Sequence, residues 1–203
     1  MPPAEFFSEH WEAAPLIAQG GAFRGALQGL PSWESLLDVL DAAERAGSLI
    51  LLKDQHPTQE HTSAAAAYLD GCSAIVNHAE RCCAGVHALC VALRSELPHV
   101  FANMYLTPPH ARAVDAHADD RDVLVLQLAG RKSWRVWPEP PVVRPAAPEQ
   151  VGKAGLPVPP EVWAATPREL TLTPGDVLYL PRGFVHEVSA MAARPFALLL
   201  LAS

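Results

Sequence analysis

The sequence predicts a mainly β protein, with a helical N-terminal part ahead of a double-stranded β-helix, the jelly-roll barrel. Two textures along the chain indicate this fold. Residues 1–99 carry apolar side chains mostly at helical spacing, whereas residues 100–203 carry short apolar runs that end at glycine or proline. Many short strands with such turns, after a helical preface, are typical of double-sheet barrels.

Composition limits the protein class. The 203 residues are 50% hydrophobic and 18% charged, which suits one folded domain with a sizeable core. A net charge of -7 argues against broad phosphate binding, so no direct nucleic-acid binding is expected. We see no signal peptide and no apolar run long enough to span a bilayer. We therefore expect no membrane contact and a soluble intracellular protein, cytoplasmic or, in a eukaryote, nuclear or nucleolar.

The helical part, residues 1–99, is expected to pack on the barrel. Each predicted helix has apolar residues at helical spacing and a local stop signal. The predicted helices are 32–47, capped by Ser32, then 63–69 and 80–97, with a short strand over 49–52. In the last helix, Cys83, His87 and Cys90 share one face, but we interpret the cysteines as small apolar core residues.

The barrel part, residues 100–203, alternates short strands with turns. A Pro-rich segment, 137–169, interrupts it and is interpreted as a long crossover or lid. The predicted strands are 122–128, 133–137, 169–173, 176–180, 185–189 and 196–201.

A tight corner precedes a histidine near the end of the chain. In PGDVLYLPRGFVHEV, residues 174–188, Pro181 fixes φ and Gly183 tolerates a positive φ, so the returning strand begins near His186. The spacing of these residues matches the second metal motif of cupin barrels. Alone, His186 would be interpreted as a hydrogen-bonded core histidine.

An H-x-D pair upstream changes that interpretation. His117 and Asp119 are separated by one residue and point to the same side of an extended chain. Together with His186 they form the two-histidine, one-carboxylate set of non-haem Fe(II) oxygenases, which leaves positions for a 2-oxoacid and O₂. Other cupins use H-x-H and a later glutamate, but Val123 and Leu124 occupy those glutamate positions here. The contrast favours three ligands over four.

A 2-oxoglutarate co-substrate also needs a cation for its distal carboxylate. Lys132 begins the strand after the Gly130 turn, on the same face as Trp134 and Val136, so it is predicted to point inward. Arg194, after His186, is a rival anchor that we rank second.

Three segments resemble the cupin-type Jumonji-C (JmjC) ribosomal oxygenases. They are ANMYLTPP at 102–109, HADDRDVLVLQLAGRKSWRVW at 117–137 and LTPGDVLYLPRGFVHEV at 172–188. The opening FFSEHWEAAPL also resembles the first helix and strand of that family. The resemblance covers nearly the whole chain, and the three motifs together are specific.

The resemblance implies a JmjC-type barrel and an enzyme dependent on Fe(II), 2-oxoglutarate and O₂. Its members hydroxylate histidine or arginine in ribosomal proteins, so a ribosomal protein is the implied substrate. By position, the family's iron ligands fall on His117, Asp119 and His186, its co-substrate lysine on Lys132, and its pocket-lining asparagine and tyrosine on Asn103 and Tyr105. We interpret Gln127, which also recurs in the family, as a hydrogen-bonding strand residue.

Two departures leave questions open. The loop before the metal pair reads PPHARAVDAH in place of the family's glycine- and proline-containing pattern, and it adds Asp115, which we expect to be solvated. This loop helps to form the substrate mouth, so the target residue stays open. Larger members carry a dimerisation region and a winged-helix domain after the barrel. Here we expect no winged-helix domain, either because this is a minimal form or because it is a fragment, so the oligomeric state is open.

Two other functions fit the same residues. N-methyl-lysine demethylation uses the same iron centre and differs only in the group presented to it. A non-catalytic, metal-binding cupin is the second alternative, and the intact triad with Lys132 argues against it.

Overall fold

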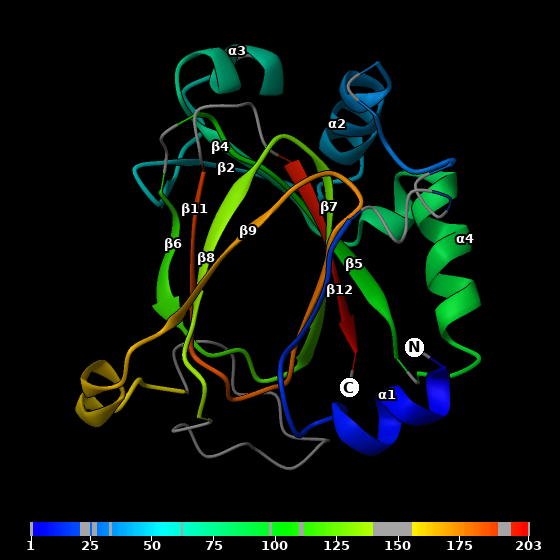
Figure 1. Cartoon of the computed structure of the whole chain (residues 1–203). Coiled ribbons are helices and arrows are strands. Elements are labelled where there is room, and N and C mark those ends of the chain that lie inside the picture. Colours follow the sequence, from blue (N-terminus) through cyan, green and yellow to red (C-terminus); the bar gives the residue numbers. More distant parts are fainter. Residues whose placement is uncertain are drawn as a thin grey trace.

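Two facing β-sheets form the core of the protein, with helices packed on the outside of the larger sheet (Figure 1). The computed structural model describes residues 2–20, 25, 28–32, 34–61, 63–97, 99–109, 112–139, 156–190 and 196–202, of which 112–114, 190 and 196–202 are described by backbone alone. The strand order is β1-β10-β7-β12-β5-β4-β2-β3 in the larger sheet and β6-β11-β8-β9 in the smaller one. The predicted double-stranded β-helix is thereby confirmed.

The element bounds are close to those predicted for the barrel. The strands are β1 (Leu16–Ala18), β2 (Leu49–Lys53), β3 (His56–Pro57), β4 (Ser73–Val76), β5 (Phe101–Leu106), β6 (Arg112–His117), β7 (Asp122–Ala129), β8 (Lys132–Val136), β9 (Arg168–Leu172), β10 (Val177–Leu180), β11 (His186–Ala190) and β12 (Phe196–Ala202). The helices are α1 (Pro3–Glu9), α2 (Leu36–Arg45), α3 (Ala64–Leu69) and α4 (Ala84–Leu93), with 3-10 turns η2 (Ala79–Arg81) and η4 (Pro160–Ala164). Strands β1 to β4 belong to the larger sheet, so the N-terminal part contributes to the barrel as well as covering it.

Two helices are shorter than predicted. Helix α2 begins after Ser35, whose hydroxyl accepts a hydrogen bond from the Ser32 N–H, so the predicted cap lies in the preceding turn. Helix α4 loses its predicted first turn because Glu80 is buried and its carboxylate accepts the Ala102 N–H of β5 at 3.0 Å. In that helix Cys90 is fully buried and His87 is exposed, which fits the core interpretation of the cysteine.

Strand β7 of the larger sheet is buried on both faces. On β7, Val123 and Val125 pack inside the barrel with Trp134 and Leu178, whereas Leu126 packs outward against the helices. This explains the nearly continuous apolar run of β7, which a half-exposed strand would not show. No helix in the described part of the chain has both the length and the apolar character needed to cross a bilayer.

Candidate metal centre

The corner between β10 and β11 fixes where His186 enters the barrel. Gly183 has a φ of +83°, a left-handed conformation that favours glycine, and its N–H donates to the Asp119 carbonyl at 2.9 Å. Phe184 and Val185 follow as buried side chains. The corner is therefore bonded directly to the segment that carries the candidate carboxylate ligand.

Strand pairing places the two histidines opposite each other. In the antiparallel β6–β11 pair, His186 lies in register with His117, and their ring centroids are 4.5 Å apart. His186 is buried, with 4% of its surface exposed. The two histidines are 69 residues apart in the sequence, and the pairing of β6 with β11 brings them side by side.

Each histidine is held through one ring nitrogen. Nδ1 of His117 lies 2.7 Å from the Asp115 carbonyl oxygen, and Nδ1 of His186 lies 3.1 Å from the Phe184 carbonyl oxygen. A carbonyl only accepts, so each Nδ1 carries the proton and each Nε2 keeps its lone pair for a ligand. Asp115 contributes its backbone here, and its side chain is exposed as predicted.

The Nε2 atoms of the two histidines converge on one carboxylate. Asp119 Oδ1 lies 3.8 Å from His117 Nε2, and Asp119 Oδ2 lies 3.5 Å from His186 Nε2. All three ligand atoms lie within 4.8 Å of one another. Neighbouring ligands with bonds of about 2.1 Å to one ion stand about 3 Å apart, so small side-chain movements would complete a divalent site. The donor set fits Fe(II) with open positions.

Lys132 is a buried cation deeper in the barrel. Only 2% of its surface is exposed, and its Nζ lies 5.9 Å from the centre of the Tyr105 ring. Burial lowers the pKa of Lys132 to about 8. No carboxylate of the described residues forms an ion pair with it, so an incoming anion would be its natural partner. The rival Arg194 falls outside the described residues.

Asn103 and Tyr105 lie on the barrel-facing side of β5. Their neighbours Ala102 and Met104 pack outward against the helices, so alternation turns this pair inward. Burial and the nearby Asp119 charge raise the pKa of Tyr105 to about 12. Tyr105 therefore adjoins both the candidate metal carboxylate and Lys132. Asn103 also has a structural contact, because its Oδ1 accepts the His78 N–H at 3.1 Å.

Gln127 has the structural role predicted for it. It is fully buried, and its side-chain amide donates to the Ala129 carbonyl within the same strand. Its backbone N–H donates to the Asp176 carbonyl of the turn before β10. These contacts hold the strand end and do not involve the three candidate ligands.

The sequence analysis did not predict a network of hydrogen bonds and an ion pair next to the turn between β10 and β11. The Tyr179 hydroxyl donates to Asp122 Oδ1 at 2.5 Å and accepts the Glu12 N–H at 2.9 Å. Glu12 in turn pairs with Arg182 of the corner at 2.9 Å. Burial raises the pKa of Asp122, so this carboxyl depends on its hydrogen bonds. An acidic residue at the start of the apolar β7 run was the signal available in the sequence.

We expect Tyr179→Phe to lower the free energy of unfolding by about 1–3 kcal/mol, because it removes the hydroxyl that donates to a buried carboxyl. Urea denaturation measures this. In a double-mutant cycle with Asp122→Ala, the two losses should couple by about 1 kcal/mol or more. Strictly additive losses would show that the two side chains stabilise the corner independently.

A second cluster of ligand-type side chains lies away from this centre. His61, Asp70 and Cys72 have ligand atoms within 4.8 Å of one another. The Lys53 ammonium already pairs with Asp70 at 2.8 Å, and burial raises the pKa of the Cys72 thiol. A resident lysine and a protonated thiol do not favour a metal ion, so we assign none there.

Comparison with known proteins gives a consistent family. Residues 81–198 match the JmjC domain family. Ribosomal oxygenase 1 of Gallus gallus is 31% identical over 204 residues, covering 93% of this chain and 33% of that protein. The bifunctional lysine-specific demethylase and histidyl-hydroxylase NO66 of Aedes aegypti is 35% identical over 128 residues, covering 61% of this chain and 19% of that protein.

Solved structures show the same fold. The Escherichia coli ribosomal oxygenase YcfD, in complex with cobalt and 2-oxoglutarate, matches with a TM-score of 0.63 at 19% identity. The match covers 100% of this chain and 52% of YcfD. Our chain therefore spans about half of this structural relative and a third or less of the two curated relatives.

Proposed function

Because this chain belongs to the JmjC domain family, we propose that it is an Fe(II)- and 2-oxoglutarate-dependent oxygenase that hydroxylates a protein side chain. Histidine or arginine of a ribosomal protein is the proposed target. The observation that carries this proposal is the convergence of His117, Asp119 and His186 at one end of a barrel. The same barrel buries Lys132, which has no ion-pair partner among the described residues.

The residues have separate roles in this proposal. His117, Asp119 and His186 would hold the iron, and Lys132 would pair with the distal carboxylate of 2-oxoglutarate. When bound, Fe(II) supplies the dioxygen activation that couples decarboxylation of 2-oxoglutarate to oxidation of a C–H bond. The chain itself orients the ligands, because carbonyl contacts fix both imidazoles and Gly183 ties the corner to Asp119.

Strand geometry fits a dicarboxylate between the lysine and the metal. Val136 pairs with His186, and Lys132 lies four residues away along β8, about 13 Å of strand. A lysine side chain and a five-carbon dicarboxylate together bridge such a span. Trp134, between them on the same face, is buried with its ring centroid 5.9 Å from that of His186 and helps to keep water out.

A direct test of the function uses intact ribosomal proteins. Incubation with Fe(II), 2-oxoglutarate and O₂ should add 16 Da to one of them, located by tandem mass spectrometry, with release of succinate. Omission of 2-oxoglutarate is the control. If iron binds but neither succinate nor a mass gain is produced on any ribosomal protein, the proposed function is wrong. If methyl-lysine peptides are not turned over either, a metal-binding, non-catalytic cupin is favoured.

The second candidate function is lysine demethylation. It is favoured by relatives whose name combines a lysine-specific demethylase with a histidyl-hydroxylase. Methyl-lysine peptides under the same conditions distinguish the two, because demethylation removes 14 Da from the peptide whereas hydroxylation adds 16 Da.

A further inference from the structure

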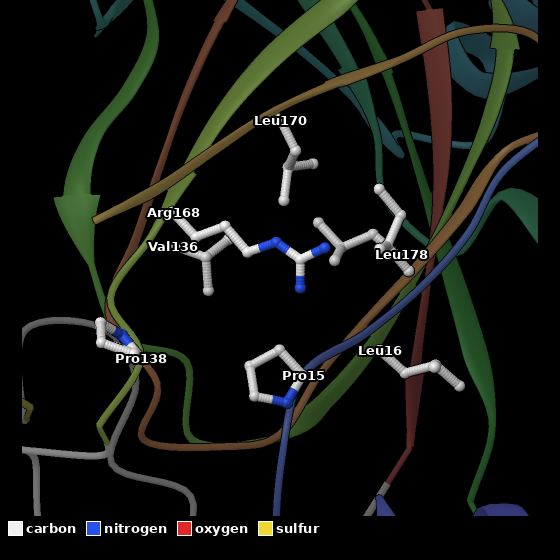
Figure 2. Close-up of a pocket in the computed structure, with 8 residues that line it drawn as sticks. Pro15, Leu16, Val136, Pro138, Arg168, Leu170 and Leu178 are labelled. Carbon is white, nitrogen blue, oxygen red and sulfur yellow. The ribbon is translucent and has the colours of Figure 1, made fainter. Parts of the chain in front are cut away.

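A small cavity opens at the seam where the two sheets meet. Here β9, the edge strand of the smaller sheet, faces β1 and β10 of the larger one (Figure 2). The cavity measures about 160 Å³, and its walls are aliphatic or proline side chains that include Ile17, Leu170 and Leu178. An apolar cavity of about 150 Å³ holds a group the size of benzene, so this one suits a single side chain.

One charged group enters this apolar space. Arg168, the first residue of β9, extends its guanidinium between the walls (Figure 2). Within the described ranges, no carboxylate lies at ion-pair distance from it. Its neighbour Glu169 projects from the opposite face of the strand. A guanidinium stays protonated and binds a carboxylate through two parallel hydrogen bonds. The cavity is therefore lined mainly by aliphatic side chains, and the Arg168 guanidinium favours an anion there.

The sheet register relates this cavity to the candidate metal centre. Val136 of β8 pairs with His186 on one side and with Arg168 on the other, so the three residues form one row across the smaller sheet. Val136 also lines the cavity. Two strand spacings place the Arg168 backbone about 10 Å from that of His186. An extended peptide covers this distance in about three residues.

We propose that this cavity, the Arg168 pocket, is a subsite for an acidic side chain of the protein substrate. The glutamate or aspartate would lie two or three residues from the residue presented to the metal. Its methylene groups would contact the aliphatic walls and its carboxylate would pair with Arg168. This inference rests on the proposed function, because it assigns the subsite to a peptide whose reacting residue occupies the metal end of the barrel.

Peptide arrays test the subsite without turnover. Each decapeptide has a fixed histidine or arginine at its centre. It carries glutamate or glutamine two or three positions to either side, and its other positions are mixed. Binding is measured in the absence of O₂. Wild type should prefer the glutamate peptides about five- to tenfold, and Arg168→Ala should reduce the preference below twofold. Arg168→Glu should instead prefer lysine at the same position.

Arg135→Ala is the matched control. Arg135 lies on β8, is exposed on the outer face of the sheet and pairs with Glu187 at 2.8 Å, so its loss should leave the preference unchanged. A glutamate preference that is absent in wild type, or that persists in Arg168→Ala, would overturn the subsite.

Oxidation of the same arrays separates the two proposals. If peptides gain 16 Da equally in wild type and in Arg168→Ala, the proposed oxygenase activity is supported and the proposed subsite is wrong. A glutamate preference that depends on Arg168, with no peptide oxidised, would support the subsite and count against the proposed hydroxylation.

Discussion

Replacing His117 by alanine is expected to abolish 2-oxoglutarate turnover and to weaken Fe(II) binding about a hundredfold or more. Only three side chains of the described residues converge at this centre, so the variant would hold the ion through one carboxylate and one imidazole. Loss of groups that merely orient metal ligands already costs 10- to 100-fold in affinity. Anaerobic calorimetry with Fe(II) and succinate release measure the two effects.

His61→Ala is a matched control for this variant. The side chains of His61 and His117 are 14% and 12% exposed, and each lies near an aspartate. The control should keep wild-type iron affinity and turnover. Iron should also raise the Tm of the wild type and the control but not that of His117→Ala, because a ligand stabilises only a fold that binds it. Full turnover in His117→Ala would contradict the assignment of the metal centre.

Sequence reasoning succeeded where one local pattern determines one structure. Short apolar runs that end at glycine or proline predicted β7 to β12 within one or two residues of their observed ends. The H-x-D pair and the corner at Gly183 predicted three side chains that the structure brings within 4.8 Å of one another. In each case a few neighbouring residues contain the whole signal, because strand alternation and turn geometry are local properties.

Other features depend on contacts that no local pattern contains. Strand β4 lies in the part of the chain whose sequence has mostly helical spacing, and it is recognised by its pairing with β2 and β5. Asp122 and Tyr179 are 57 residues apart, and their hydrogen bond exists because β7 and β10 pair. Arg168 lies in the row of His186 through the register of β8. Register is set by the whole barrel, so these features required the structure.

Lys132→Met should raise the KM for 2-oxoglutarate about a hundredfold, because it keeps the apolar stem and removes the buried charge that would pair with the distal carboxylate. Lys132→Arg should recover part of this loss. The affinity of the wild type should fall as pH rises through about 8, where the free lysine loses its proton. The Met variant should show no such decline. An unchanged KM in Lys132→Met would place the co-substrate anchor elsewhere.

Lys132→Met should weaken 2-oxoglutarate binding but increase the stability of the folded chain. The unfolded chain keeps the lysine proton up to its ordinary pKa near 10.5, whereas the folded chain releases it at about 8. Between these values the unfolded state binds more protons, so the free energy of unfolding rises with pH. Lys132→Met should therefore be more stable than wild type by about 3 kcal/mol at pH 7, and this advantage should shrink as pH approaches 10. If Lys132 served only the fold, its replacement would lower the free energy of unfolding of the protein. A gain in stability together with a loss of 2-oxoglutarate affinity would show that Lys132 is retained for binding.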